Sequence, residues 1–144
     1  AYEIASCLVG SEMCIRDSSR TGAVVSFIGT VRDLASESLI SLTIEHYPGM
    51  TEKSLALIAD KVREKWELES ITIIHRVGTL SIGDQIVLVI TSSKHRQEAF
   101  DSCNYIMDYL KTDAPFWKKE ASDKEEKWVI NRSSDEKQKN RWSS

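Results

Sequence analysis

Apolar residues follow two different spacings along this chain, and the order of those spacings constrains its fold more than any other feature. In two segments, 51–66 and 94–111, they recur every three to four positions, which is the spacing of one helix face. Strand-like segments that alternate or are β-rich surround them: 23–31, 39–47, 71–77, 86–90, 116–121 and 127–132. This order predicts an α+β domain with a mostly antiparallel sheet, two main helices and a C-terminal hairpin.

Local signals mark the ends of these elements. Thr51 is expected to cap the first helix, and Ser92 or Ser93 the second, because short polar side chains can accept the free N–H groups there. Pro115 fixes the end of the second helix. Residues 86–90 are apolar on both faces, which is typical of a central strand. The apolar face of the second helix is expected to consist of Phe100, Cys103, Met107 and Leu110.

Composition narrows the class of protein. The chain has 144 residues, the size of one domain. Its 19 basic and 22 acidic side chains give a net charge of −3, which disfavours binding to nucleic acid through overall charge. The longest apolar run, 86–90, is far shorter than the roughly 20 residues of a membrane span. Three cysteines without C-x-x-C spacing favour a reducing, cytoplasmic location over a disulfide scaffold or a zinc site.

The first twenty residues differ from the rest. Residues 1–20 show no sustained helical or strand spacing, and the segment 7–18 resembles translated library-adaptor sequence. We expect an N-terminal arm that is either artefactual or disordered and carries no function. Residues 21–144 are expected to form the domain, with a polar tail after Ser133.

Basic residues gather where the second helix is expected to begin. Lys94, His95 and Arg96 add positive charge to the positive end of the helix dipole, which is unfavourable unless an anion such as phosphate binds there. A solvated basic helix start is the simpler alternative. Arg32, which follows the strand end 29–31, suits bidentate phosphate or carboxylate binding, with an ordinary surface arginine as the alternative.

Lysines surround the other end of the same helix. Lys111 closes the helix, where a cation is favourable in any case. Lys118 and Lys119 follow in a strand and point to opposite faces, so at most one of them enters a given pocket. A lysine beside other cations and apolar rings can have a lowered pKa and take part in proton transfer.

Other candidate groups are expected to be structural. His46 and His75 share strand faces with apolar side chains, and Cys103 lies on an apolar helix face. The histidines lack metal-ligand spacing, and no Ser-His-Asp order, phosphate-binding loop or dinucleotide-binding glycine pattern occurs, so neither a metal nor a cofactor is expected. The residues alone therefore predict a cytoplasmic α+β domain with a local site for an anionic ligand.

Four stretches of the chain carry a family resemblance: GAVVSFIGTVRD, LTIEHYPGMTEKSL, ITSSKHRQEAF and, most specifically, IMDYLKTDAPFWKKEA. From about residue 22 to residue 142 the chain resembles the catalytic (large) subunit family of molybdopterin synthase. The resemblance implies an α/β hammerhead fold with an added C-terminal β-hairpin subdomain. It also implies a sulfurtransferase that converts cyclic pyranopterin monophosphate to molybdopterin in molybdenum cofactor biosynthesis.

The resemblance implies partners as well. Sulfur would arrive as a thiocarboxylate on the C-terminal Gly-Gly of a small ubiquitin-like subunit, so no catalytic cysteine is needed. The catalytic subunits would form a homodimer within a heterotetramer. The substrate would be a small pterin phosphate, with neither nucleic acid nor a membrane as a partner.

Functional residues can be carried over by motif. The resemblance implies two catalytic lysines: Lys111 matches the family's lysine at the thiocarboxylate tail, and Lys118 matches its second pocket lysine. The matching substrate-binding positions are Thr30, Val31, Arg32, His95, Arg96, Lys119, Glu120 and Arg132. The chain departs from the family pattern in the loop 33–38 and at Asp113, where a basic residue is common.

Spacing adds a geometric expectation. His95 and Lys111 are 16 positions apart on one expected helix, which places them roughly 24 Å from each other. Because a pterin phosphate is much shorter, both can serve one substrate only from different subunits. We expect a composite site, with His95 and Arg96 from one chain and Lys111 and Lys118 from the other. The alternative function is a non-catalytic module that binds a ubiquitin-like tail or a phosphate or RNA ligand.

Overall fold

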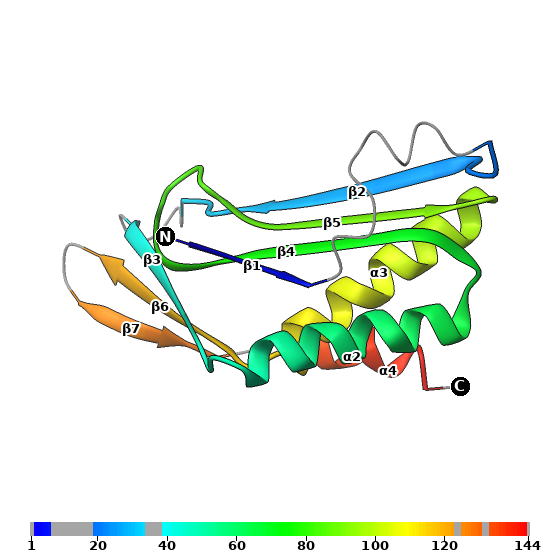
Figure 1. Ribbon diagram of the computed structural model, residues 1–144. Coiled ribbons are helices and arrows are strands. Elements are labelled where there is room, and N and C mark those ends of the chain that lie inside the picture. Colours follow the sequence, from blue (N-terminus) through cyan, green and yellow to red (C-terminus); the bar gives the residue numbers. More distant parts are fainter. Residues whose placement is uncertain (1, 7–18, 34–38, 123–124, 131–132, 144) are drawn as a thin grey trace.

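The computed structural model describes residues 2–6, 19–33, 39–122, 125–130 and 133–143. These residues hold seven strands and three helices (Figure 1). In chain order they are β1 (Tyr2–Ser6), β2 (Ala23–Thr30), β3 (Leu39–His46), α2 (Met50–Lys65), β4 (Leu68–Ser81), β5 (Gln85–Ser93), α3 (Arg96–Thr112), β6 (Phe116–Ser122), β7 (Glu126–Val129) and α4 (Ser133–Asn140).

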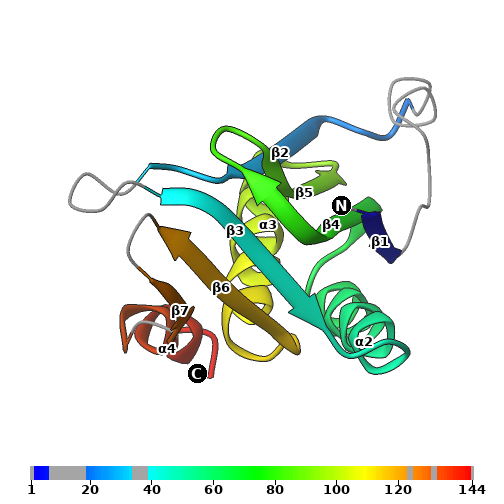
Figure 2. The same ribbon diagram turned by 90° about the vertical axis from the view of Figure 1, so that its left-hand side faces the viewer.

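The described strands pair antiparallel in the order β2-β5-β4-β3-β6-β7, with β1 also paired to β4. The long strand β4 joins two parts of the sheet, because Ile73–Val77 pair with β1 and Gly78–Ser81 pair with β3. β5 lies between β2 and β4, which confirms the central strand predicted at residues 86–90. Figure 2 shows β3, β6 and β7 side by side. The predicted α+β class and the C-terminal hairpin are therefore confirmed.

The core lies between the sheet and the two long helices, α2 and α3, which cover one sheet face (Figure 1). The α2 stripe predicted from helical spacing is buried, with Leu55 and Val62 at 0% exposure. On α3 the predicted stripe is right for Cys103 and wrong for Phe100, which is 54% exposed. Ile106, at 0% exposure, fills the core instead.

Both helices begin differently from the prediction. Gly49 is the N-cap of α2 with φ 81°, and its N–H donates to the carboxylate of Glu52 at 2.6 Å. Thr51 lies inside the helix, so it is not the cap. His95 is the N-cap of α3 because β5 continues to Ser93, and the prediction of a serine cap is wrong.

Two described elements were not expected from the sequence. Tyr2–Ser6 form β1 against β4, so the expectation that residues 1–20 lack regular structure is wrong for this segment. The polar stretch after Ser133 was expected to be a tail and instead forms α4, which lies against α3. The domain boundary at residue 21 stays a prediction. Among the described residues, no helix has the length and apolar character needed to cross a membrane.

Candidate active site

The end of α3 and the following strand bring two lysines together. Lys111 lies in the last turn of α3, and Lys118 lies on β6. Lys118 is paired in register with Ile44 of β3, whose side chain is 1% exposed, so Lys118 points to the covered face of the sheet. The positive charge of Lys111 acts on Lys118 and lowers its pKa.

The environment of Lys118 disfavours its charged form. Burial is the largest cause of its lowered pKa, and the charge of Lys111 is the second. The carboxylates of Asp135 and Glu120 act in the opposite direction and raise this pKa. A lysine with a lowered pKa exchanges a proton more readily at neutral pH than an ordinary lysine does. The lowered pKa predicted for this group of lysines is found at Lys118, and its part in proton transfer stays a prediction.

The residues next to Lys118 alternate as predicted. Lys119 lies on the opposite face of β6, where it forms an ion pair with Glu126. Its Nζ also lies 5.9 Å from the ring centroid of Trp128. Glu120 returns to the face of Lys118. We call Lys111, Lys118 and Glu120 the lysine cluster. Lys119 lies outside it, on the opposite face of β6.

A buried histidine lies beside the cluster. His75 is 6% exposed, its Nδ1 lies 2.8 Å from the carbonyl oxygen of Arg76, and its ring stacks on Phe116. Burial lowers its pKa to about 4, and the charge of Lys118 contributes to the lowering, so the ring is neutral at pH 7. The packed role predicted for His75 is confirmed, and His46 is half-buried.

The basic pair at the start of α3 lies far from the lysines. His95 and Arg96 are exposed and begin a helix of 17 residues that ends beyond Lys111. At 1.5 Å per residue this helix is about 25 Å long. Figure 1 shows it running from the end of β5 towards the start of β6. One chain therefore does not bring these two groups into one site.

The strand end at Thr30 lies on the side of the molecule opposite to His95. Thr30 pairs with Gln85 at the start of β5, whereas His95 follows the end of β5. Thr30 and Arg32 are both exposed. In Figure 1 this end of β2 lies on the same side as β6, which carries Lys118.

Val31 has a structural position. Its side chain is 4% exposed and belongs to the core. Its N–H donates to the carbonyl of Asp84 at 2.9 Å, and its carbonyl accepts from the N–H of Gly83 at 2.8 Å. Arg132 and the loop residues 34–38 lie outside the described residues.

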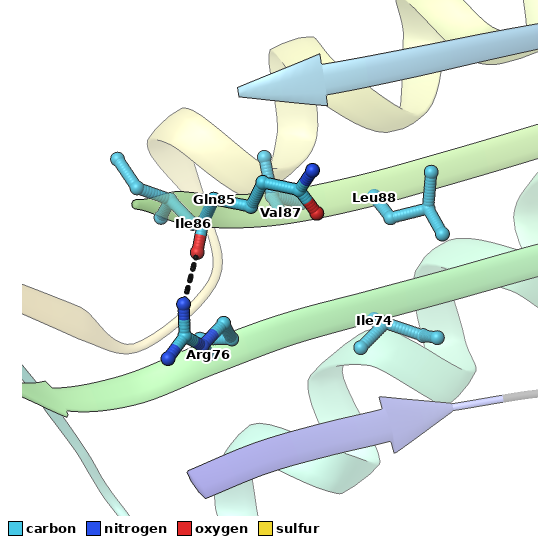
Figure 3. Close-up of a pocket in the computed structure, with 6 residues that line it drawn as sticks. All are labelled: Ile74, Arg76, Gln85, Ile86, Val87 and Leu88. Carbon is cyan, nitrogen blue, oxygen red and sulfur yellow. Dashed lines mark hydrogen bonds between the residues drawn. The ribbon is translucent and has the colours of Figure 1, made fainter. Parts of the chain in front are cut away.

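A separate pocket lies on the sheet between β4 and β5 (Figure 3). There the Arg76 guanidinium donates to the carbonyl of Gln85 at 3.1 Å. Its lining contains none of the predicted site residues; it consists of Ile74, Arg76, Gln85, Ile86, Val87 and Leu88. Within the described part of the chain, no group of three His, Cys, Asp or Glu side chains is arranged to hold a metal ion.

Sequence reasoning missed one residue that contacts the lysine cluster. Asp135 lies on α4, and its Oδ1 accepts a hydrogen bond from the Lys111 Nζ at 3.4 Å. The available signal was the charge order within 133–140, with acidic residues first and lysines last, which matches a helix dipole.

Comparisons with known proteins agree with the fold and with the motifs. The model of the family described as MoaE protein matches residues 6–113. The molybdopterin synthase catalytic subunit of Vibrio cholerae is 50% identical over 129 residues, which cover 89% of this chain and 86% of that protein.

Comparison with solved structures also agrees with the fold. The crystal structure of molybdopterin synthase from Staphylococcus aureus superposes with a TM-score of 0.77 at 36% identity, covering 85% of this chain and 91% of that one. A complex of subunits 1 and 2 of the molybdopterin-converting factor from Helicobacter pylori has the same fold, with a TM-score of 0.67 at 21% identity over 79% of this chain and 75% of that one. The chain belongs to the MoaE family, and relatives that are 50% identical to it are molybdopterin synthase catalytic subunits.

Proposed function

We propose that this chain is the subunit of molybdopterin synthase that converts cyclic pyranopterin monophosphate to molybdopterin. The sulfur donor is the C-terminal thiocarboxylate of a small ubiquitin-like subunit. The observation that carries the proposal is the lysine pair at the junction of α3 and β6 in a chain of this family, with Lys111 exposed and Lys118 half-buried. The substrate phosphate and the thiocarboxylate are both anions, and both suit a cationic site.

The two lysines have different roles in this proposal. Lys111 is 49% exposed, so the tail of a second protein can reach it, and its ammonium binds that tail. Lys118, whose pKa is lowered by burial and by the charge of Lys111, moves the proton. Acyl transfer from a thiocarboxylate builds negative charge on a carbonyl oxygen, which a nearby ammonium stabilises.

The site is completed by a second copy of the chain. His95 and Arg96 of one protomer meet the lysine pair of the other, because α3 holds these groups at opposite ends. The protein is then a homodimer within a heterotetramer with two small subunits. Arg32 joins the site from the protomer that supplies the lysines.

Subunit mixing tests this composite site. His95→Ala and Lys111→Ala homodimers should each be inactive, and their mixture should recover up to about a quarter of the wild-type activity through heterodimers with one intact site. No recovery after verified subunit exchange would place both residues in one chain's site.

The remaining carried-over positions complete the substrate contacts. Thr30, Glu120 and Arg132 flank the pterin and its phosphate, and Lys119 lies at the edge of the site. Val31 contributes by fixing the strand end that presents Arg32, since its side chain lies in the core. We place the enzyme in the cytoplasm, a location favoured by the odd number and the spacing of its cysteines.

The activity is tested with the purified chain, the thiocarboxylated small subunit and the pterin substrate. Lys111→Ala and Lys118→Ala should each lower the rate of product formation by about 100-fold or more. Lys53→Ala, which removes an exposed lysine from α2, is the matched control and should retain wild-type activity.

Other outcomes identify the alternatives. A wild-type chain that binds the small subunit and yields no product would be a non-catalytic adaptor. RNA binding that weakens steeply with salt would indicate a nucleic-acid ligand.

A further inference from the structure

The C-terminal segment, residues 139–142, is held against the second half of α3 by hydrogen bonds and ion pairs. The Trp142 indole donates to the Asp108 carboxylate at 2.7 Å, and the Arg141 guanidinium donates to the same carboxylate at 3.0 Å. The Lys139 ammonium donates to Asp113 at 2.6 Å. In these contacts α3 and its C-cap provide the acidic residue, and the C-terminal segment provides the donor.

Aromatic packing anchors the same segment. The Trp142 ring meets Trp66 and Tyr105 edge to face, with centroids 5.6 Å and 5.5 Å apart. Trp142 also packs against the hydrophobic core. The position of α4 is therefore fixed by contacts that do not involve Asp135.

The contact at Lys111 has the opposite polarity. Here α3 provides the cation and α4 provides the carboxylate, with Asp135 Oδ1 3.4 Å from the Lys111 Nζ. The side chain of Asp135 is 19% exposed and that of Lys111 is 49% exposed, so the carboxylate is the more enclosed partner. A fixed carboxylate thus meets the ammonium at the end of a flexible four-carbon side chain.

We propose that Asp135 is a positioning residue of the sulfur-transfer site, which holds the Lys111 ammonium beside Lys118. This inference rests on the proposed function. Two neighbouring ammonium groups repel each other, and the Asp135 carboxylate offsets that repulsion. An ammonium has three N–H donors, so Lys111 can donate to Asp135 and to the anionic tail of the small subunit together. α4 is therefore part of the site.

The test compares Asp135→Asn, Asp135→Glu and Asp113→Asn with the wild-type full chain. Asp113→Asn is the matched control, because it removes the same charge from the same interface and breaks the contact with Lys139 instead. Thermal unfolding of each variant verifies that it folds.

The first readout is independent of activity. Labelling with acetic anhydride over a pH series, followed by mass spectrometry, gives the pKa of Lys118. This pKa should fall further in Asp135→Asn, because the carboxylate raises it. It should return towards the wild-type value in Asp135→Glu and stay unchanged in Asp113→Asn. An unchanged pKa in Asp135→Asn would overturn the proposal.

The second readout is kinetic. Asp135→Asn should lower kcat/KM by roughly two- to fivefold, the range for a solvent-accessible ion pair. The limb of the pH–rate profile that depends on a lysine should move to lower pH, with both effects reversed in Asp135→Glu. Equal kinetics in wild type and Asp135→Asn, or a faster Asp135→Asn, would overturn the positioning role and leave the proposed function intact. An inactive wild type would contradict the proposed function, while the labelling result would still decide the contact.

Discussion

The imidazole of His75 stacks on the ring of Phe116, with centroids 3.8 Å apart and planes 15° from parallel. This contact joins β4 to the first residue of β6, the strand that carries Lys118. A protonated ring would place a charge in a buried position close to the ammonium of Lys118. Burial and the charge of Lys118 therefore favour the neutral form of His75.

Protonation of His75 should make the protein less stable in mild acid. The pKa of His75 is about 4 in the folded chain because of burial, against 6.5 when unfolded. Its contribution is fully present above pH 6.5 and is lost as the pH falls towards 4, because only the unfolded state binds the proton in that window. The loss between pH 7 and pH 5 should be about 2 kcal/mol. Urea unfolding at both pH values measures it.

A variant without this titration supplies the comparison. His75→Gln should lose less stability between pH 7 and pH 5 than the wild type does, because it lacks the titrating imidazole. The loss that remains comes from carboxylates elsewhere, which titrate in both proteins. Equal losses in the two proteins would mean that His75 is protonated in the folded state or exposed to solvent.

Removing side-chain volume from the core between β4 and the helices should lower the stability of the protein. Ile73 is 0% exposed, and Ile73→Ala should lower the free energy of unfolding by about 2–5 kcal/mol. Leu57→Ala on α2 is the control, since Leu57 is 60% exposed and should change stability by less than about 0.5 kcal/mol. Denaturant unfolding at pH 7 compares them, and similar effects would contradict the assigned core.

Much of the architecture follows from local patterns. Helical spacing predicted α2 within two residues at its start and one residue at its end, because its apolar stripe matches the face that packs on the sheet. Alternation in β6 predicted that Lys118 and Lys119 point to opposite faces, since the pleat of a strand has a fixed period of two. These features depend on residues that are close together in the sequence, so the sequence alone is enough to predict them.

The parts that could not be predicted depend on tertiary contacts. α4 is polar on all sides and has no buried residue, so it has no apolar stripe to reveal it. It is held against α3 by ion pairs such as Lys139 with Asp113, which join residues far apart in sequence. The contact of Asp135 with Lys111 could not be predicted for the same reason. The cap of α3 moved to His95 because strand pairing with β2 and β4 extends β5 to Ser93.

The start of β2 should have no room for a side chain at Gly22. A Cβ built there would lie 2.2 Å from the carbonyl oxygen of Lys94, and the Gly22 N–H donates to the carbonyl of Ser93 at 3.0 Å. Gly22→Ala should therefore push the backbone before α3 away and lower stability by about 1–3 kcal/mol. It should also reduce activity, because the segment leads directly to His95.

Gly83→Ala is the comparison for Gly22→Ala, because it adds backbone strain without a steric clash. Gly83 has φ 86° and open space around its Cβ position, so alanine there costs about 1 kcal/mol through conformation alone. Gly83 lies in the turn that joins β4 to β5, and urea unfolding of both glycine variants compares the cost of strain with the cost of the clash. A Gly22→Ala protein with wild-type stability and activity would contradict the close approach.

Cys103 should be chemically inert in the folded protein. Burial in the core raises the pKa of its thiol to about 11 and leaves its side chain 5% exposed. Only the thiolate reacts with disulfide reagents, so at pH 8 the folded chain should label at Cys103 at least about 100-fold more slowly than the urea-unfolded chain. Mass spectrometry of the peptide that contains Cys103 keeps its reaction separate from those of Cys7 and Cys14. Comparable rates in the two states would mean that this face of α3 opens to solvent, and the packing of α3 on the sheet would have to be revised.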